Sequence, residues 1–126
     1  MNAVSQTASA SVLVVDDEPG VRSALRLVLE HGGYSVTEAA NGIEAMDRLR
    51  THSVDVVLID LFMPEKEGLE TIADFRQHYP GLKIIAISGA FSGEFLEIAK
   101  HLGADRALAK PIRGADLLAT IQGVLS

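Results

Sequence analysis

The sequence predicts an α/β protein in which a parallel sheet of five strands carries helices on both faces, a doubly wound fold. Short, β-branched apolar runs alternate five times with longer amphipathic stretches, and the runs are too short to form helices. Parallel strands need crossovers, which the amphipathic stretches supply, whereas closing a barrel would take more strands. The 126 residues fit one domain, and we expect no separate output module within them.

The five predicted strands differ in how continuously apolar they are. Three have apolar side chains at successive positions, as expected for strands covered on both faces: 12–15, 54–59 and 82–87. Residues 34–38 alternate instead, which suits a strand near the edge of the sheet, and residues 106–109 rest mainly on their place in the alternation. Residues 1–11 are small and polar, so we expect a flexible N-terminal tail before a domain at 12–126.

The five intervening stretches place apolar residues three and four apart, on one face of a helix. The first begins near Pro19 and ends before Gly32 and Gly33, and Asn41 is suited to cap the second. Gly103 is expected to end the fourth. The apolar positions are Val21, Ala24, Leu25, Val28 and Leu29 in the first helix, Leu69, Ile72, Ala73 and Phe75 in the third, Phe91, Phe95, Ile98, Ala99 and Leu102 in the fourth, and Leu117, Leu118, Ile121, Val124 and Leu125 in the fifth.

The composition excludes several classes of protein. There is no cysteine, so disulfides, thiolate nucleophiles and cysteine-ligated zinc are ruled out. The net charge of −6 argues against a nucleic-acid or anionic-membrane surface. No apolar run approaches the ~20 residues that span a bilayer, and the N-terminus lacks the features of an export signal. We therefore expect an acidic domain located in the cytoplasm.

Polar side chains follow four of the predicted strands directly. They are Asp16, Asp17 and Glu18 after the first strand, Asp60 after the third, Ser88 after the fourth and Lys110 after the fifth. The carboxyl ends of parallel strands meet at one edge of the sheet, where ligands bind in such folds. Glu18 alone is better explained as an acidic residue at a helix N-terminus. The other residues predict a functional site.

The acidic residues of this edge indicate a bound cation. Carboxylates at one pocket repel one another, and the repulsion grows as the local dielectric constant falls. Oxygen ligands from carboxylates are what Mg²⁺ prefers. The charge of −3 on Asp16, Asp17 and Asp60 would be balanced by one Mg²⁺ and Lys110. The alternative is a solvated acidic edge, which the clustering disfavours.

The same residue types suit phosphoryl transfer. A dication, an ammonium group and a hydroxyl around a carboxylate can hold the oxygens of a phosphoryl group. Asp60 follows the most apolar strand and is the expected nucleophile, with an acyl phosphate as product. Ser88 could donate its hydroxyl to a phosphoryl oxygen, and Pro111 favours an extended backbone at Lys110. A lone serine or Lys-Pro pair would more often be turn chemistry.

Taken together, these motifs resemble one known family. They are Val14-Val15-Asp16-Asp17-Glu18-Pro19, Asp60-Leu61-Phe62-Met63-Pro64 with Gly68, Ser88-Gly89-Ala90, and Gly103-Ala104-Asp105 leading to Lys110-Pro111. Their order and spacing over residues 12–125 resemble the receiver domain of two-component response regulators. The resemblance implies a flavodoxin-like fold with strand order 2-1-3-4-5. It also implies a cis Lys110-Pro111 bond.

The resemblance assigns a role to each site position. Asp60 is implied as the phosphoacceptor, which takes its phosphoryl group from a histidine on a sensor kinase or phosphotransfer protein and loses it slowly by hydrolysis. Ser88 and Lys110 are implied to contact the phosphoryl group. The implied ligands of Mg²⁺ are Asp16, Asp17, Asp60 and the backbone carbonyl of Phe62. The fourth helix, fifth strand and fifth helix form the implied surface for a downstream protein partner.

Two positions need separate consideration. The family usually carries an aromatic switch residue three places before the lysine, where this chain has Ala107. Phe91 and Phe95 are candidates to substitute for it, although their helical spacing favours ordinary core packing. Phe62 is large, and we hypothesise that it restricts water near Asp60 and so alters the lifetime of the phosphate.

Other functions are weaker alternatives. The chain could be a receiver-like protein-binding module that is never phosphorylated, although every site residue is present. It could be a small Mg²⁺-dependent phosphatase, but it lacks a cap and has Phe62 where a second aspartate would stand. A nucleotide-binding protein would need a glycine-rich loop in place of Asp16-Asp17-Glu18. The four histidines lie near predicted helix ends, and we expect them on the surface.

Overall fold

The computed structural model describes residues 10–61, 67–89 and 93–126, and it confirms the five strand–helix units. The strands are β1 (Ser11–Val15), β2 (Ser35–Ala39), β3 (Val56–Asp60), β4 (Lys83–Ser88) and β5 (Arg106–Ala109). The helices are α1 (Pro19–His31), α2 (Gly42–Thr51), α3 (Glu67–His78), α4 (Gly93–Leu102) and α5 (Gly114–Leu125). All neighbouring strands are parallel, in the order β2-β1-β3-β4-β5, as the resemblance implied.

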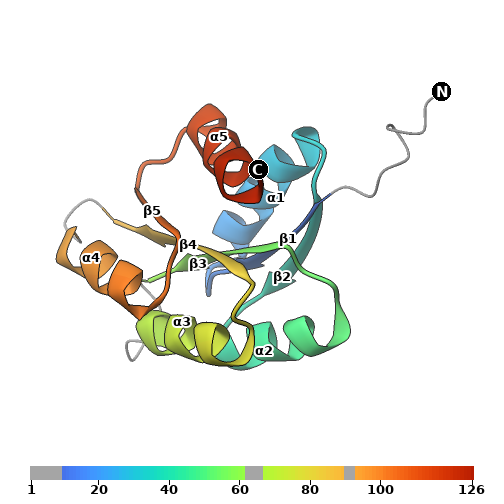
Figure 1. Ribbon diagram of the computed structural model, residues 1–126. Coiled ribbons are helices and arrows are strands. Elements are labelled where there is room, and N and C mark those ends of the chain that lie inside the picture. The colour runs from blue at the N-terminus through green and yellow to red at the C-terminus, as the bar shows by residue number, and fades with distance from the viewer. Residues whose placement is uncertain (1–9, 62–66, 90–92) are drawn as a thin grey trace.

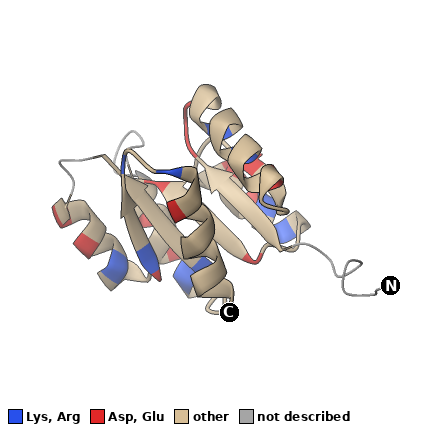
Figure 2. Cartoon of the chain, turned by 90° about the horizontal axis from the view of Figure 1, so that it is seen from above, with Lys and Arg blue, Asp and Glu red and all other residues tan. Residues whose placement is uncertain are grey.

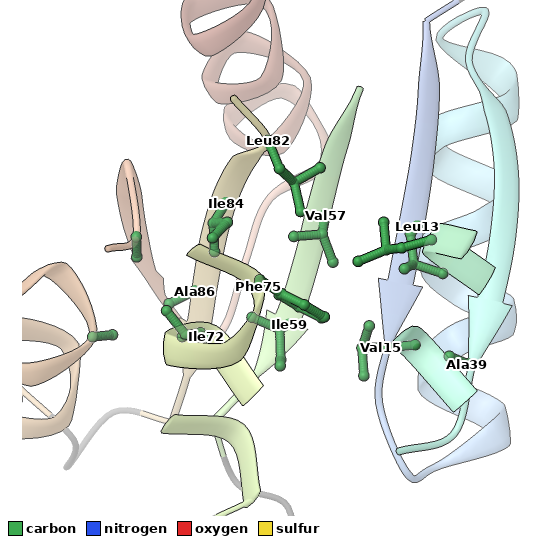
Figure 3. Packing of buried hydrophobic residues seen from close by; sticks show 14 of the residues in the cluster. Leu13, Val15, Ala39, Val57, Ile59, Ile72, Phe75, Leu82, Ile84 and Ala86 are labelled. Atoms are coloured by element: carbon green, nitrogen blue, oxygen red, sulfur yellow. The ribbon is translucent and has the colours of Figure 1, made fainter. Parts of the chain in front are cut away.

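Helices cover both faces of the sheet, α1 and α5 on one side and α2, α3 and α4 on the other (Figure 1). Strand residues alternate between the two faces, so each central strand contributes to two buried clusters. Figure 3 shows the cluster on the side of α2 to α4, where Phe75 and Ile72 of α3 pack against Ile59. The other cluster joins strands β1, β3 and β4 to Leu29 of α1 and Leu117 of α5. This arrangement explains the continuous apolar runs of the sequence.

The strand boundaries differ from the predicted ones by one or two residues. β3 begins at Val56 instead of Val54, because the Asp55 side chain accepts a hydrogen bond of 2.7 Å from the backbone N–H of Ser11. This bond also holds Ser11 in β1, so assigning Ser11 to the tail is wrong, while residues 1–9 lie outside the described chain. β3 ends on Asp60 and β4 ends on Ser88, each one residue later than predicted.

The predicted helix ends are confirmed by their local chemistry. The Asn41 side chain accepts a hydrogen bond of 2.8 Å from the N–H of Glu44, and the Glu44 carboxylate accepts one of 3.0 Å from the N–H of Ala40. This reciprocal pair satisfies donors at the start of α2. Gly33 and Gly103 follow α1 and α4 with φ of 95° and 129°, a region that glycine adopts without strain.

The surface is charged and mixed in sign. Acidic and basic residues are interspersed over the helices (Figure 2). All four histidines are exposed and lie at or near helix C-termini, as predicted: His31, His52, His78 and His101. In the described parts of the chain, none of the helices has the length and apolar character that crossing a bilayer requires.

Candidate functional site

Two of the predicted carboxylates lie together at the carboxyl edge of the sheet. Asp60 is the last residue of β3, and Asp16 follows neighbouring β1 directly. Both are nearly inaccessible, with exposed fractions of 2% for Asp16 and 5% for Asp60. Burial raises the pKa of Asp16 to about 7; the N–H of Glu18 opposes this, and a hydrogen bond to Asp60 and its charge add to it. A pair this close favours either a shared proton or a cation.

The ammonium group of Lys110 supplies part of the missing positive charge. Its Nζ lies 2.9 Å from Oδ2 of Asp60. Burial alone would lower the pKa of Lys110, but the hydrogen bond to Asp60 and the charges of Asp60, Asp16 and Glu18 outweigh burial and raise it. The bond that follows, Lys110-Pro111, is cis, as the resemblance implied. Lys110 is therefore a charged partner of Asp60 throughout the neutral range.

The hydroxyl of Ser88 is buried and lacks a hydrogen-bond partner among the described residues. It ends β4, beside β3, and its exposed fraction is 0%. Among the described residues, its Oγ has no hydrogen-bond partner. The backbone carbonyl of Ser88 is well held, because it accepts a hydrogen bond of 2.6 Å from the N–H of Lys110. A buried hydroxyl without a partner costs free energy unless a ligand atom completes it.

Asp17 takes a different position from its neighbour. Its side chain is exposed, and within residues 10–61, 67–89 and 93–126 no group of three histidine, aspartate or glutamate side chains is arranged to hold a metal ion. The expected cluster of three carboxylates is thus a buried pair beside an exposed third residue. The ligand role of Asp17 stays a prediction, and Phe62 lies outside the described residues.

The pair nevertheless fits a small hard cation. Asp16 and Asp60 offer oxygen donors only, which suits Mg²⁺. A dication would relieve the repulsion that burial has intensified between them. The exposed Asp17 beside the pair leaves space for the water ligands that Mg²⁺ retains.

Close packing fixes the backbone beneath Asp60. Gly68 near the start of α3 approaches the end of β3 so closely that a Cβ there would lie 2.9 Å from the Asp60 carbonyl oxygen and 2.8 Å from Cα of Leu61. Only glycine fits at this distance without displacing backbone. Because of this contact, Gly68 holds α3 against the strand end that carries Asp60.

A groove of about 560 Å³ opens beside the carboxylate pair. Its walls are α1 and the segment after β5, and its floor is the surface of the sheet. Most of its lining is apolar, with Asp16, Asp60 and Lys110 as the charged members; the apolar side chains are Val15, Val21, Ala24, Leu25, Leu58, Ile87, Pro111 and Ile112. This groove could not be predicted from the sequence, because it joins segments about 90 residues apart in the chain.

Of the residues considered for the aromatic switch, Ala107 lies in β5 and Phe95 lies in α4. Ala107 pairs with Ala86 in the β4–β5 ladder and is half-buried. Phe95 was expected in the core, but it is 42% exposed on α4, so core packing is wrong for this residue. Phe91 lies outside the described residues.

Comparison with known proteins agrees with the geometry. The chain matches the response regulator receiver domain family over residues 12–122. It is 36% identical over 114 residues to response regulator MprA of Mycobacterium sp. (strain KMS), and 35% identical over 117 residues to that of Mycobacterium bovis. These alignments cover 90% and 93% of this chain but 50% and 51% of the relatives, so the chain spans about half their length.

Solved structures show the same architecture. A CheY-like receiver domain protein from Methanospirillum hungatei JF-1 superposes with a TM-score of 0.87 at 30% identity, covering 94% of both chains. Chemotaxis protein CheY4 from Vibrio cholerae superposes with a TM-score of 0.86 at 34% identity, covering 93% of this chain and 99% of that one. With four strand-end motifs in register on this fold, the chain belongs to the response regulator receiver domain family, the phosphoacceptor modules of two-component signalling.

Proposed function

We propose that Asp60 is the phosphoacceptor of this receiver domain. One observation carries the assignment: Asp60 is a nearly inaccessible carboxylate at a strand end whose Oδ2 lies 2.9 Å from the Lys110 ammonium. A carboxylate is normally buried only when a specific charge partner holds it. Here the partner is also placed to contact a phosphoryl oxygen once one is bound to Asp60.

The transfer of the phosphoryl group is a substitution at phosphorus. An oxygen of Asp60 forms a bond to phosphorus, and the bond from phosphorus to the donor's imidazole nitrogen breaks, so the imidazole keeps that electron pair. Lys110 pairs with the growing negative charge on the phosphoryl oxygens. The unsatisfied Oγ of Ser88 is the natural donor to another of these oxygens. Later hydrolysis of the acyl phosphate returns Asp60 to its starting state.

Receiver domains generally bind Mg²⁺, and we propose that Asp16, Asp17, Asp60 and the Phe62 carbonyl bind it here. When bound, the ion neutralises charge on the phosphoryl oxygens as they approach the carboxylates. The chain's own contribution is to hold Asp16 against Asp60, which the hydrogen bond between them supports. Asp17 is adjacent in sequence and exposed, so its carboxylate can reach an ion through water.

Self-phosphorylation tests this function directly. The native chain is incubated with acetyl phosphate, with and without Mg²⁺, and its intact mass is measured before and after hydroxylamine treatment. We expect one added phosphate that requires Mg²⁺ and is released by hydroxylamine, as an acyl phosphate should be. A chain that gains no phosphate would support the unphosphorylated binding module instead. Rapid metal-dependent release of phosphate from unrelated monoesters would support the phosphatase.

We further propose that the apolar groove between α1 and the segment after β5 receives the protein that donates the phosphoryl group. The donor's phosphohistidine must reach Asp60, and this groove ends on Asp60. Its apolar walls offer burial to side chains next to that histidine. The donor would be a sensor histidine kinase or a histidine phosphotransfer protein.

A charge placed in the groove separates donor docking from chemistry. Ala24 is exposed and lines the groove, so Ala24→Glu should slow transfer from a phosphohistidine donor by about tenfold, or ~1.4 kcal/mol. Ile98→Glu, at a 43% exposed apolar residue of α4, makes the same charge change outside the groove and should not slow it. Acetyl phosphate should phosphorylate all three chains alike. Equal slowing by both substitutions would contradict this docking site.

The output surface is a separate proposal. We place it on α4, β5 and α5, because α4 exposes two large apolar side chains, Phe95 at 42% and Ile98 at 43%. Exposed apolar residues close together on one helix are suited to a protein partner. With alanine at position 107, the side chain through which phosphorylation reaches this surface would differ from the usual aromatic one.

A further inference from the structure

We propose that Arg22 is a positioning residue for the carboxylate pair, acting through the backbone of Asp16; the inference rests on the proposed phosphoacceptor function. Nη1 of Arg22 donates a hydrogen bond of 2.6 Å to the carbonyl oxygen of Asp16. Among the described residues, Arg22 bonds to Glu38 and to the backbone of Asp16, so its effect passes through the position of Asp16. In the sequence, Arg22 is a charged residue next to the apolar positions of α1, and the pattern did not predict this role.

Asp16 is held at three points, and Arg22 supplies one of them. Its N–H donates to the carbonyl of Ala39 on β2 at 3.1 Å, and its Oδ1 accepts from the N–H of Glu18 at 2.9 Å. The remaining polar group of the Asp16 backbone is its carbonyl, just past the end of β1. Arg22 binds this carbonyl, so the peptide that follows Asp16 has one orientation. This backbone carries the Asp16 carboxyl group, which is hydrogen-bonded to Asp60.

Arg22 is itself fixed by an ion pair with Glu38. Its Nε lies 3.1 Å from Oε1 of Glu38, and the two side chains are only 16% and 27% exposed. The hydrogen bond from Arg26, followed by burial and the bond from Arg22, sets the pKa of Glu38, with a net lowering. Glu38 is therefore ionised at neutral pH. A partly buried guanidinium that bridges two acceptors holds its geometry better than an exposed ion pair.

Arg26 offers a matched control on the same helix. Its Nε donates to the other Glu38 oxygen at 2.7 Å, a shorter bond than that of Arg22, and it also pairs with Glu30 at 3.1 Å. No hydrogen bond joins Arg26 to Asp16 among the described residues. Removing either arginine takes one cation and one ion pair from Glu38. Only the removal of Arg22 also frees the Asp16 carbonyl.

The test measures Mg²⁺ binding to the unphosphorylated chain by calorimetry, with unfolding by urea as the check on folding. Arg22→Met should raise the dissociation constant for Mg²⁺ about tenfold, as for other losses of groups that orient metal ligands. Arg26→Met should change it by less than about twofold. Arg22→Lys should recover only part of the affinity, because an ammonium cannot serve both acceptors in the planar geometry of guanidinium.

A second readout separates positioning from general destabilisation. In self-phosphorylation, Arg22→Met should raise the Mg²⁺ concentration for half-maximal rate and leave the rate at saturating Mg²⁺ within about threefold of native. Equal Mg²⁺ affinities in Arg22→Met and Arg26→Met would overturn the inference, as would loss of affinity in proportion to lost stability in both. If the native chain binds no Mg²⁺, the proposed function fails instead, so the two failures are distinguishable.

Discussion

Asp60→Asn is expected to abolish the gain of phosphate from acetyl phosphate. The substitution keeps the shape of the side chain, but an amide oxygen is a far weaker nucleophile than a carboxylate. It also removes the ion pair with Lys110 Nζ at 2.9 Å. The measurement is intact mass after incubation with acetyl phosphate and Mg²⁺, compared at equal protein concentration with the native chain.

Asp74→Asn is the matched control for this experiment. Asp74 lies exposed on α3 and makes the same change of charge away from the strand ends. It should take up one phosphate as the native chain does. Phosphate uptake by Asp60→Asn at the native level would show that another residue accepts it. Loss of uptake in both variants would show a dependence on net charge instead of on one nucleophile.

Asp16→Asn is expected to stabilise the metal-free chain and to weaken its binding of Mg²⁺. The folded pKa of Asp16 is raised from 3.8 to about 7, so the folded chain holds a proton that the unfolded chain has lost between these values. By linkage, Asp16 costs the fold increasing free energy as pH rises from about 4 to 7, and a constant amount above that. At about 1.4 kcal/mol for each pH unit between 3.8 and 7, the full cost is at most about 4 kcal/mol.

Urea unfolding at pH 4 and pH 8, with and without Mg²⁺, tests both parts. Without metal, Asp16→Asn should exceed the native stability at pH 8 and come close to it at pH 4, where the folded-state carboxyl is protonated and the unfolded-state carboxyl is only partly ionised. Adding Mg²⁺ at pH 8 should stabilise the native chain and not the variant, because ligands that bind only the fold add to its stability. A variant less stable than native at pH 8 without metal would show that the pair is not strained.

Asp17→Asn is the comparison that isolates burial. It removes the same charge from the adjacent residue, which is exposed. It should leave the stability of the metal-free chain nearly unchanged between pH 4 and pH 8. A gain equal to that of Asp16→Asn would mean that net charge, and not the buried pair, sets the stability.

The fold, and the edge of the sheet where the site lies, could be predicted from the sequence alone. Continuous apolar runs indicate which strands are covered on both faces. Parallel strands bring their carboxyl ends to one edge of the sheet, independently of the conformation of the loops. Asp16, Asp60, Ser88 and Lys110 could therefore be assigned to one edge from their places after the strands. The caps at Asn41 and Gly33 were equally local, since they depend on hydrogen bonds within a few residues.

Which side chains come into contact at the site could not be predicted from the sequence, because it depends on the packed fold. Asp16 and Asp17 are adjacent in sequence, yet Asp16 is buried against Asp60 directly after β1, whereas Asp17 is exposed in the bend that leads to α1. Phe95 fits the apolar spacing of α4, yet its side chain is 42% exposed. Arg22 holds Asp16 only because β2 places Glu38 beside α1. Periodicity records spacing along the chain, whereas these contacts depend on distances across it.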